Sequence, residues 1–309
     1  MKTQSKAMPE SFDSPGITPA VMSATRPLYW SVRRELSENR SIYLAPLAAA
    51  ATALLGFLIS MSLPHRMSGL STLHPANERE LIAQPYDIAA GVMMATMILV
   101  IVFYCADALY GERRDRSIFF WKSLPVSDFT TVLAKASIPF VVLPLLTFAI
   151  TIALQFIMLL LNSAVLLARG MNVALLWTQL SVIQMWLLLL YHLITAHTLW
   201  PAPVYCWLLL VSGWARRATL LWAALPIVAI AGFEKLVFQT SHFAALVGTR
   251  FIGDTPSAAF TMPGTFPMDP MTHVTPGTFL STPGLWIGLA VAAAFLAAAV
   301  RLRRYQGPV

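Results

Sequence analysis

Six long apolar runs divide this chain of 309 residues and constrain its fold more than any other feature. Each run approaches or exceeds the roughly 20 residues that an α-helix needs to cross the hydrocarbon core of a bilayer. Only 11% of the residues are charged, against roughly 25% in an ordinary soluble domain. The sequence therefore predicts an all-α membrane protein with six transmembrane helices, at residues 42–63, 88–109, 136–161, within 180–211, 219–238 and 285–300.

The fourth run leaves two arrangements open. It is too long for one straight span and too short for a comfortable hairpin, and Pro201 and Pro203 interrupt it. Either one long, kinked helix crosses once, or a helix is followed by a short re-entrant piece. We prefer the single crossing, because a second crossing would remove the uneven distribution of Lys and Arg between the two sides of the membrane.

The basic residues test the topology. Of the 21 Lys and Arg residues, 16 fall in segments that six spans place on one side of the membrane. Because cytoplasmic segments are enriched in Lys and Arg, we expect a multi-pass protein of the cell inner membrane with both termini cytoplasmic. Residues 1–26 are then a disordered cytoplasmic N-terminus and 305–309 a cytoplasmic tail. Residues 239–283, rich in Thr, Pro and Met, form an extracytoplasmic loop, either a linker or a lid over an outer exit.

An amphipathic helix is predicted directly before the first span, at residues 27–41. Leu28, Val32 and Leu36 recur at helical spacing on one side of it. We expect this helix to lie in the membrane interface, although a helix of a soluble bundle has the same pattern. Its interfacial residues are Trp30, Arg33, Arg34 and Glu35.

Several functional classes lack support in the sequence. The net charge of +7 is scattered at the ends of apolar runs rather than gathered on one segment, so we expect no nucleic acid partner. There is no phosphate-binding G-x-x-x-x-G-K-[ST] loop, no H-E-x-x-H and no G-x-S-x-G. His192 and His197 are five residues apart, which does not place them on one helical face. Cys105 and Cys206 lie inside apolar runs, typical of small buried residues. We therefore predict no enzyme activity, catalytic residue, metal site or cofactor in this chain itself.

Glu234 is the one acidic residue near the outer end of the fifth predicted span, next to Lys235. An ionisable group inside a membrane is costly, so it is a candidate functional residue. Two interpretations stay open. Glu234 lines a polar pathway or a subunit contact, or it simply reaches the outer headgroups.

The segment between the second and third spans, residues 110–135, reads "YGERRDRSIFFWKSLPVSDFTTVLAK" and has six charged side chains from Glu112 to Lys122, together with four consecutive bulky apolar residues. This order of parts resembles the permease subunit of ABC-2 type transporters: an amphipathic helix, two spans, a charged cytoplasmic loop and six spans in all. In that family the loop has an acidic-basic start, a Leu-x-x-Pro-like turn followed by a small polar residue, and a Lys at the foot of the third span. Here these are Glu112 and Arg113, residues 124–127, and Lys135.

The resemblance implies a type V exporter-like architecture with one six-helix transmembrane domain, residues 42–304. It implies a second permease copy, identical or closely related, and a separate ABC ATP-binding subunit that holds ATP and Mg. The loop would dock into that subunit as a coupling helix. Its partner-binding residues would be Glu112, Arg113, Arg114, Asp115, Arg116, Phe119, Phe120, Trp121, Lys122, Leu124 and Pro125.

Physical reasoning agrees with a docking role for this loop. Charges supply register and steering, and Phe119, Phe120 and Trp121 supply an apolar anchor. Pro125 ends the helix, and Ser127 or Asp128 caps the next one. A loop that only fixes topology explains the arginines but not the aromatic residues. The alternative functions are a membrane-embedded lipid-modifying enzyme and a scaffold or signalling protein without transport.

Overall fold

The computed structural model describes residues 25–62, 75–123, 126–170, 173–252 and 276–305. Within these ranges the regular structure is helical, with no β-strand. The elements, in chain order, are α1 (Thr25–Glu38), α2 (Ser41–Ser62), α3 (Pro75–Asp107), α4 (Tyr110–Arg114), α5 (Ile118–Ser123), α6 (Asp128–Ser137), η3 (Ile138–Val142), α7 (Leu143–Ala168), α8 (Ala174–Gln179), α9 (Val182–Ile194), η4 (Thr195–Leu199), α10 (Ala202–Trp214), α11 (Thr219–Phe238), α12 (His242–Ile252), α13 (Pro276–Ser281) and α14 (Pro283–Tyr305).

Among the described residues, six helices are long and apolar enough to cross a membrane, as judged by length and composition. The predicted number of spans is thereby confirmed, and the chain has the helix content of a multi-pass membrane protein. The third candidate span is much longer than the predicted one, because α6, η3 and α7 join into one helical unit of 41 residues, Asp128–Ala168. Hydropathy detected only its apolar part.

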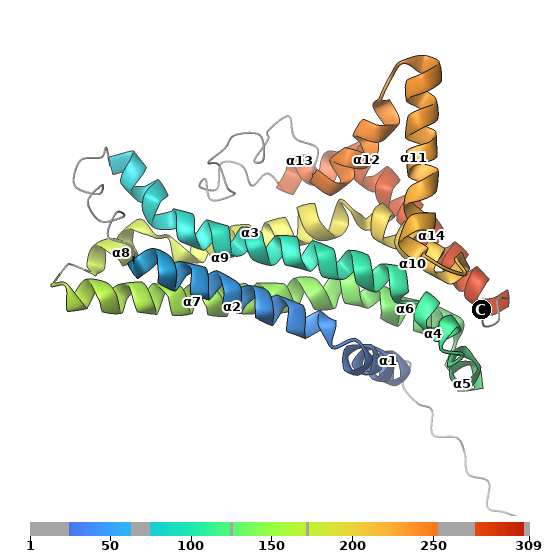
Figure 1. Cartoon of the computed structure of the whole chain (residues 1–309), viewed down its shortest axis with the longest axis horizontal. Helices are drawn as coiled ribbons and strands as arrows, with labels where there is room; N and C mark the ends of the chain where they lie inside the picture. Colours follow the sequence, from blue (N-terminus) through green and yellow to red (C-terminus); the bar gives the residue numbers. More distant parts are fainter. Residues whose placement is uncertain (1–24, 63–74, 124–125, 171–172, 253–275, 306–309) are drawn as a thin grey trace, which may run out of the picture.

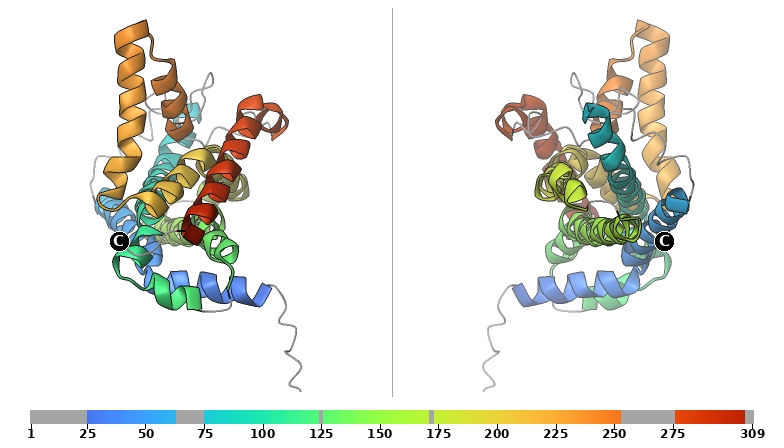
Figure 2. Two further views of the ribbon diagram at one scale, coloured as in Figure 1. Left: turned by 90° about the vertical axis from the view of Figure 1, so that its right-hand side faces the viewer. Right: turned by 90° about the vertical axis from the view of Figure 1, so that its left-hand side faces the viewer.

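Most of the helices form a long bundle. Helices α2, α3 and α7 lie side by side along its length, α10 packs against α3, and α9 packs against α7 (Figure 1). Helix α1 lies across one end, next to α4 and α5 (Figures 1 and 2). We call this end, which also holds the last turn of α14, the charged end.

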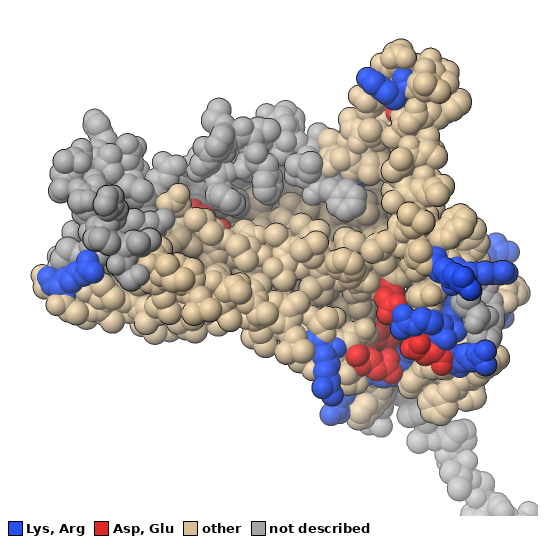
Figure 3. All heavy atoms as spheres, viewed as in Figure 1, with Lys and Arg blue, Asp and Glu red and all other residues tan. Residues whose placement is uncertain are grey.

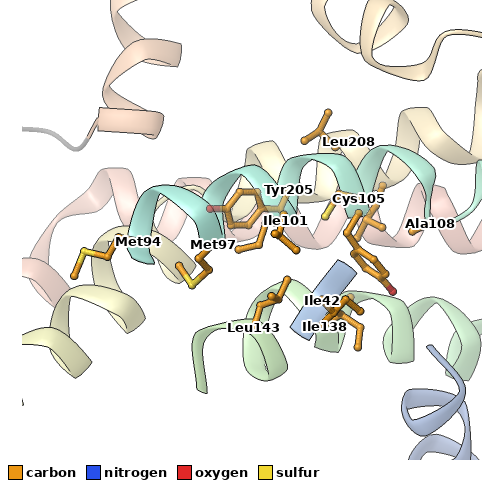
Figure 4. Packing of buried hydrophobic residues seen from close by; sticks show 14 of the residues in the cluster. Ile42, Met94, Met97, Ile101, Cys105, Ala108, Ile138, Leu143, Tyr205 and Leu208 are labelled. Carbon is orange, nitrogen blue, oxygen red and sulfur yellow. The ribbon is translucent and has the colours of Figure 1, made fainter. Parts of the chain in front are cut away.

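The core of the bundle is built from buried apolar side chains of several helices. Ile42 of α2, Ile101 of α3, Leu143 of α7 and Tyr205 of α10 belong to one cluster and are at most 1% exposed (Figure 4). Small residues line the contact between α10 and α14, among them Ala202, Cys206 and Ala292. Small side chains let two helix backbones approach closely, which favours van der Waals packing where lipid removes the usual hydrophobic driving force.

The fourth apolar run traverses the bundle once and is broken in the middle. At its start, Leu180 packs with Leu154 and Met158 of α7. At its end, Ser212 of α10 accepts a hydrogen bond from the backbone N–H of Leu109 (3.4 Å). The break is the π-helical turn η4 followed by Pro201, which agrees with the preferred kinked crossing.

Helix α11 differs from the other five candidate spans, because it leaves the bundle instead of packing inside it (Figures 1 and 2). Of its side chains only Thr219 and Ala223 are buried, and Leu221, Val228 and Leu236 are 64%, 67% and 79% exposed. Its apolar surface is therefore left to lipid or to another chain.

Helix α12 returns from the tip of α11 to the break in the fourth run. Trp200, at that break, donates its indole N–H to the carbonyl of Thr249 (2.7 Å). Arg250 lies over the Trp200 ring (4.4 Å to its centroid) and donates to the carbonyl of Gly284 (2.7 Å). Gly288 of α14 makes room for this guanidinium, since a Cβ there would lie 2.7 Å from Nη1. Trp200 is thus the point where α10, α12 and α14 meet.

Candidate docking site at the charged end

Residues 113–127, which begin in the last turn of α4, include α5 and end just before α6, are the candidate docking segment. Arg116 takes the left-handed conformation (φ 57°), which turns the chain between α4 and α5. Ile118 is buried and anchors α5, whereas Phe119 and Phe120 are 63% and 60% exposed. Two adjacent aromatic rings are therefore presented at a charged surface rather than on the apolar flank of the bundle.

A network of charged side chains lies behind this segment and is the main feature of the site. We call it the ion cluster, and its members are Arg34, Glu35, Glu112, Asp128, Lys135 and Arg303. They come from α1, α4, α6 and α14. Three are cations and three are carboxylates, so the cluster is balanced in charge. Acidic and basic side chains gather at this end of the molecule (Figure 3).

Glu112 is the centre of the ion cluster. Its carboxylate contacts Arg34 (2.7 Å) and Lys135 (3.2 Å) through one oxygen and Arg303 through the other. Only 6% of its side chain is exposed. Charge-assisted hydrogen bonds offset the loss of water around a buried carboxylate, and three cations supply them here.

Glu35 is the second buried carboxylate. It accepts hydrogen bonds from Lys135 (2.7 Å) and from the hydroxyl of Tyr104 on α3 (3.0 Å). Lys135 is 2% exposed and lies between the carboxylates of Glu35 and Glu112. The cluster thereby joins α1, which precedes the first span, to the start of the third span.

Arg34 connects the ion cluster to α5. The centre of its guanidinium lies 3.5 Å from the centroid of the Trp121 ring. This is a close cation–π contact, and the same guanidinium forms ion pairs with the carboxylates of Glu112 and Glu38 through its nitrogen atoms. Trp121 is therefore half-buried against α1, and the exposed anchor of the segment consists of Phe119 and Phe120.

The position of Glu112 and Arg113 differs from the sequence expectation. Both were expected on the docking surface, and both are buried, at 7% exposure. Arg113 donates to the carbonyls of Gly213 (2.6 Å) and Ala215 (3.2 Å) at the end of α10. A cation at a helix C-terminus satisfies carbonyls that lack partners within the helix. These two residues hold the segment in place rather than forming its surface.

Three further charges of the segment face solvent. Arg114, Asp115 and Arg116 are exposed, and Arg114 hydrogen-bonds Asp115 (3.0 Å). Ser127 caps α6 by accepting from the N–H of Thr130 (3.1 Å), as predicted. The side chain of Lys122, and Leu124 and Pro125, lie outside the described residues.

The amphipathic helix is present as α1, slightly earlier than predicted. Trp30 is 59% exposed, with Arg33 stacked over it (5.2 Å), while Val32 and Leu36 pack against the core. Glu35, expected at the interface, points inward and is 2% exposed. Its burial has a direct cause, since Lys135 and Tyr104 provide partners inside the protein.

Four contributors to the site were not assigned to it from the sequence: Asp128, Lys135, Arg303 and Tyr104. The sequence identifies Lys135 only as part of a family pattern, Asp128 only as a possible helix cap and Arg303 only as one of the 16 basic residues that indicate topology. Lys135 and Arg303 each lie at the end of an apolar helical span. An ionisable side chain at such a position often forms an ion pair with a residue inside the protein. Their partners lie 100 and 191 residues away in the chain, which no local pattern reveals.

Glu234 has a structural role that neither sequence interpretation included. Its carboxylate accepts from the N–H groups of His242 (2.7 Å) and Phe243 (2.8 Å) and from the hydroxyl of Thr240 (2.9 Å). These donors lie at the start of α12. Glu234 therefore caps the first turn of α12 and fixes the hairpin between α11 and α12.

These features define a class of protein, the helical multi-pass membrane proteins. Across the part of the chain that the structure describes, no group of three or more His, Cys, Asp or Glu side chains could hold a metal ion. No protein-family model, curated protein or solved structure matches the chain. Assignment within the class therefore rests on the site.

Proposed function

We propose that this chain is the membrane-spanning permease subunit of an ATP-driven exporter of the ABC-2 type. The observation that carries the proposal is the exposed aromatic pair on α5, Phe119 and Phe120, held on a buried ion cluster at the charged end. Aromatic anchors backed by a rigid support are typical of protein–protein hot spots. Burial in the hydrocarbon core does not explain them, because the exposed charges Arg114, Asp115 and Arg116 directly precede them in the same segment.

The partner in this proposal is a separate ABC ATP-binding subunit, which binds ATP and Mg. Arg114 and Arg116 give the segment an exposed positive charge that steers an acidic surface toward it. A second permease copy, identical or closely related, completes the substrate path, and the largely exposed helix α11 offers apolar surface for such a contact. Hydrolysis in the partner would shift the two permeases between inward-facing and outward-facing states.

Co-purification tests the docking role. The full-length chain is isolated from its native membranes in mild detergent, with and without the double change Phe119→Ala and Phe120→Ala. We expect an ATP-hydrolysing subunit to accompany the wild type and to be lost from the variant. Phe103→Ala is the matched control, because Phe103 is also 60% exposed but lies on the apolar flank of α3. Equal recovery of the ATPase from all three proteins would refute the docking role.

Labelling tests the orientation that the proposal requires, with the charged end in the cytoplasm. Cysteines are placed singly at Ser37 on α1 and at Ser241 before α12. A membrane-impermeant maleimide added to intact cells should label Ser241→Cys and should reach Ser37→Cys only after lysis. The native thiols of Cys105 and Cys206 are fully buried and should stay silent. Outside labelling of Ser37→Cys would reverse the topology and remove the basis for a cytoplasmic partner.

A further inference from the structure

Arg303, in the last turn of α14, occupies an unusual position relative to the docking segment. Its guanidinium contacts Asp128 through Nε (3.2 Å) and Glu112 through Nη1. Glu112 directly precedes the docking segment, and Asp128 directly follows it. One side chain from the C-terminal helix therefore joins the two ends of a segment far away in the sequence.

The neighbours of Arg303 show that this placement is specific. Arg301 and Arg304, in the same turn, are exposed, whereas Arg303 is 5% exposed. A guanidinium carries several N–H donors in a fixed fork, so it can serve two carboxylates at once. A lysine at the same position has one ammonium on a flexible stem, and Lys135 already occupies the other side of Glu112.

We propose that Arg303 is a positioning residue. It is a clamp that holds the two ends of the docking segment together at Glu112 and Asp128, which we call the neck, and thereby sets the orientation of α5 and its two exposed phenylalanines. The inference rests on the proposed function only for the identity of what docks there. The clamp itself is a property of this chain alone. The clamp makes the C-terminal turn of α14 part of the docking site through Glu112 and Asp128 rather than through contact with the phenylalanines.

Loss of the clamp should loosen the segment without unfolding the bundle. Without Arg303, Glu112 still has Arg34 and Lys135 as partners, so no buried carboxylate is left unpaired. The side chain of Asp128 is 30% exposed and can turn to water. The damage is therefore confined to the ends of the docking segment, where α4 and α6 lose the side chain that ties both of them to α14 but keep the direct pair of Glu112 and Lys135.

A distance measurement between spin labels tests the clamp. Labels are attached to Ser123→Cys on α5 and Arg301→Cys on α14 in the full-length chain, diluted with unlabelled protein in nanodiscs. The distance distribution should be narrow in the wild type and roughly twofold broader in Arg303→Gln, because α5 then moves independently of α14. Asp128→Asn should broaden it in the same way, and Arg304→Gln, a change in the same turn, should not.

The double variant separates a clamp from two independent stabilising contacts. If Arg303 and Asp128 act through one contact, Arg303→Gln combined with Asp128→Asn should broaden the distribution no further than Arg303→Gln alone. Should Arg303→Gln fail to fold, Asp128→Asn carries the test by itself, since its side chain is partly in water.

Recovery of the ATPase keeps the two proposals apart. A broadened distribution in a chain that never binds an ATPase leaves the clamp intact and overturns the proposed function. An unchanged distribution in both Arg303→Gln and Asp128→Asn, or a distribution that Arg304→Gln broadens equally, overturns the clamp, whatever the partner proves to be.

Discussion

Replacement of Glu112 by Gln is the sharpest test of the ion cluster, because sequence and structure assign this residue opposite roles. A residue on a docking surface can be changed with little effect on the stability of the free protein. Glu112 instead is the common partner of Arg34, Lys135 and Arg303 inside the protein. Glu112→Gln keeps the shape of the side chain and removes only its charge.

The magnitude follows from the contacts that remain. Removing one partner of a buried ion pair typically costs about 3 to 5 kcal/mol. Here Arg34 and Lys135 retain Glu35, and Arg303 retains Asp128, so we expect the lower value, about 3 kcal/mol. Unfolding entropy is about 2.1 cal/mol/K per residue, so for 309 residues each kcal/mol lowers the melting temperature by about 1.5 °C, and the variant should melt on the order of 5 °C lower.

Asp115→Asn is the matched control for this prediction. Asp115 also pairs with an arginine, Arg114, at 3.0 Å, but the two side chains are 63% and 54% exposed. Exposed pairs contribute at most about 1 kcal/mol, so this variant should melt close to the wild type. The assay is thermal unfolding of the detergent-solubilised chain, followed by fluorescence-detected size exclusion. If Glu112→Gln melted with the wild type, or if both variants fell equally, the ion cluster would not be what holds the charged end together.

Two further predictions concern the hairpin of α11 and α12. Glu234→Gln should speed hydrogen exchange of the first-turn amides of α12 while leaving recovery of the ATPase unchanged; loss of the ATPase would restore a direct role for Glu234 in function. Gly288→Ala should displace the end of the Arg250 side chain, since its Cβ would lie 2.7 Å from Nη1, and amide exchange in the last turn of α12 should rise. Gly284→Ala, whose Cβ would meet its nearest neighbour at an ordinary 3.6 Å, should leave exchange unchanged, and equal effects from the two alanines would contradict the close fit at Gly288.

Local features of this fold were predictable from the sequence because they depend on residues close together in the chain. Hydropathy found six spans, Pro201 marked the break in the fourth, and the Ser127 cap followed from its position before α6. The π-helical turn at residues 195–199 was not predicted, because nothing but backbone hydrogen bonding distinguishes it from an α-helical turn. Hydropathy also did not predict that α11 leaves the bundle, because it shows that a helix is apolar but not what the helix packs against.

The ion cluster was missed for a different reason. Charged residues in a segment between spans are normally solvated, so Glu112 and Arg113 were interpreted as surface. Their burial depends on partners that folding brings from α10, α6 and α14, among them Arg303, 191 residues from Glu112. A single sequence shows the cost of burying each charge by itself, whereas a buried cluster is stable because its charges pair with one another. The exposed pair Phe119 and Phe120 was recognised, because consecutive aromatics beside charges are unusual at any surface.

The contact between Arg250 and Gly284 has a practical consequence for protein engineering. It joins the end of α12 to the first turn of α14, so the 33 residues between them begin and end at almost the same place. The entropy of closing a flexible loop depends only weakly on its length, and each doubling costs about 0.6 kcal/mol. Lengthening the chain that connects α12 to α14, for example with an epitope, should therefore cost little stability as long as Arg250 and Gly284 keep their contact.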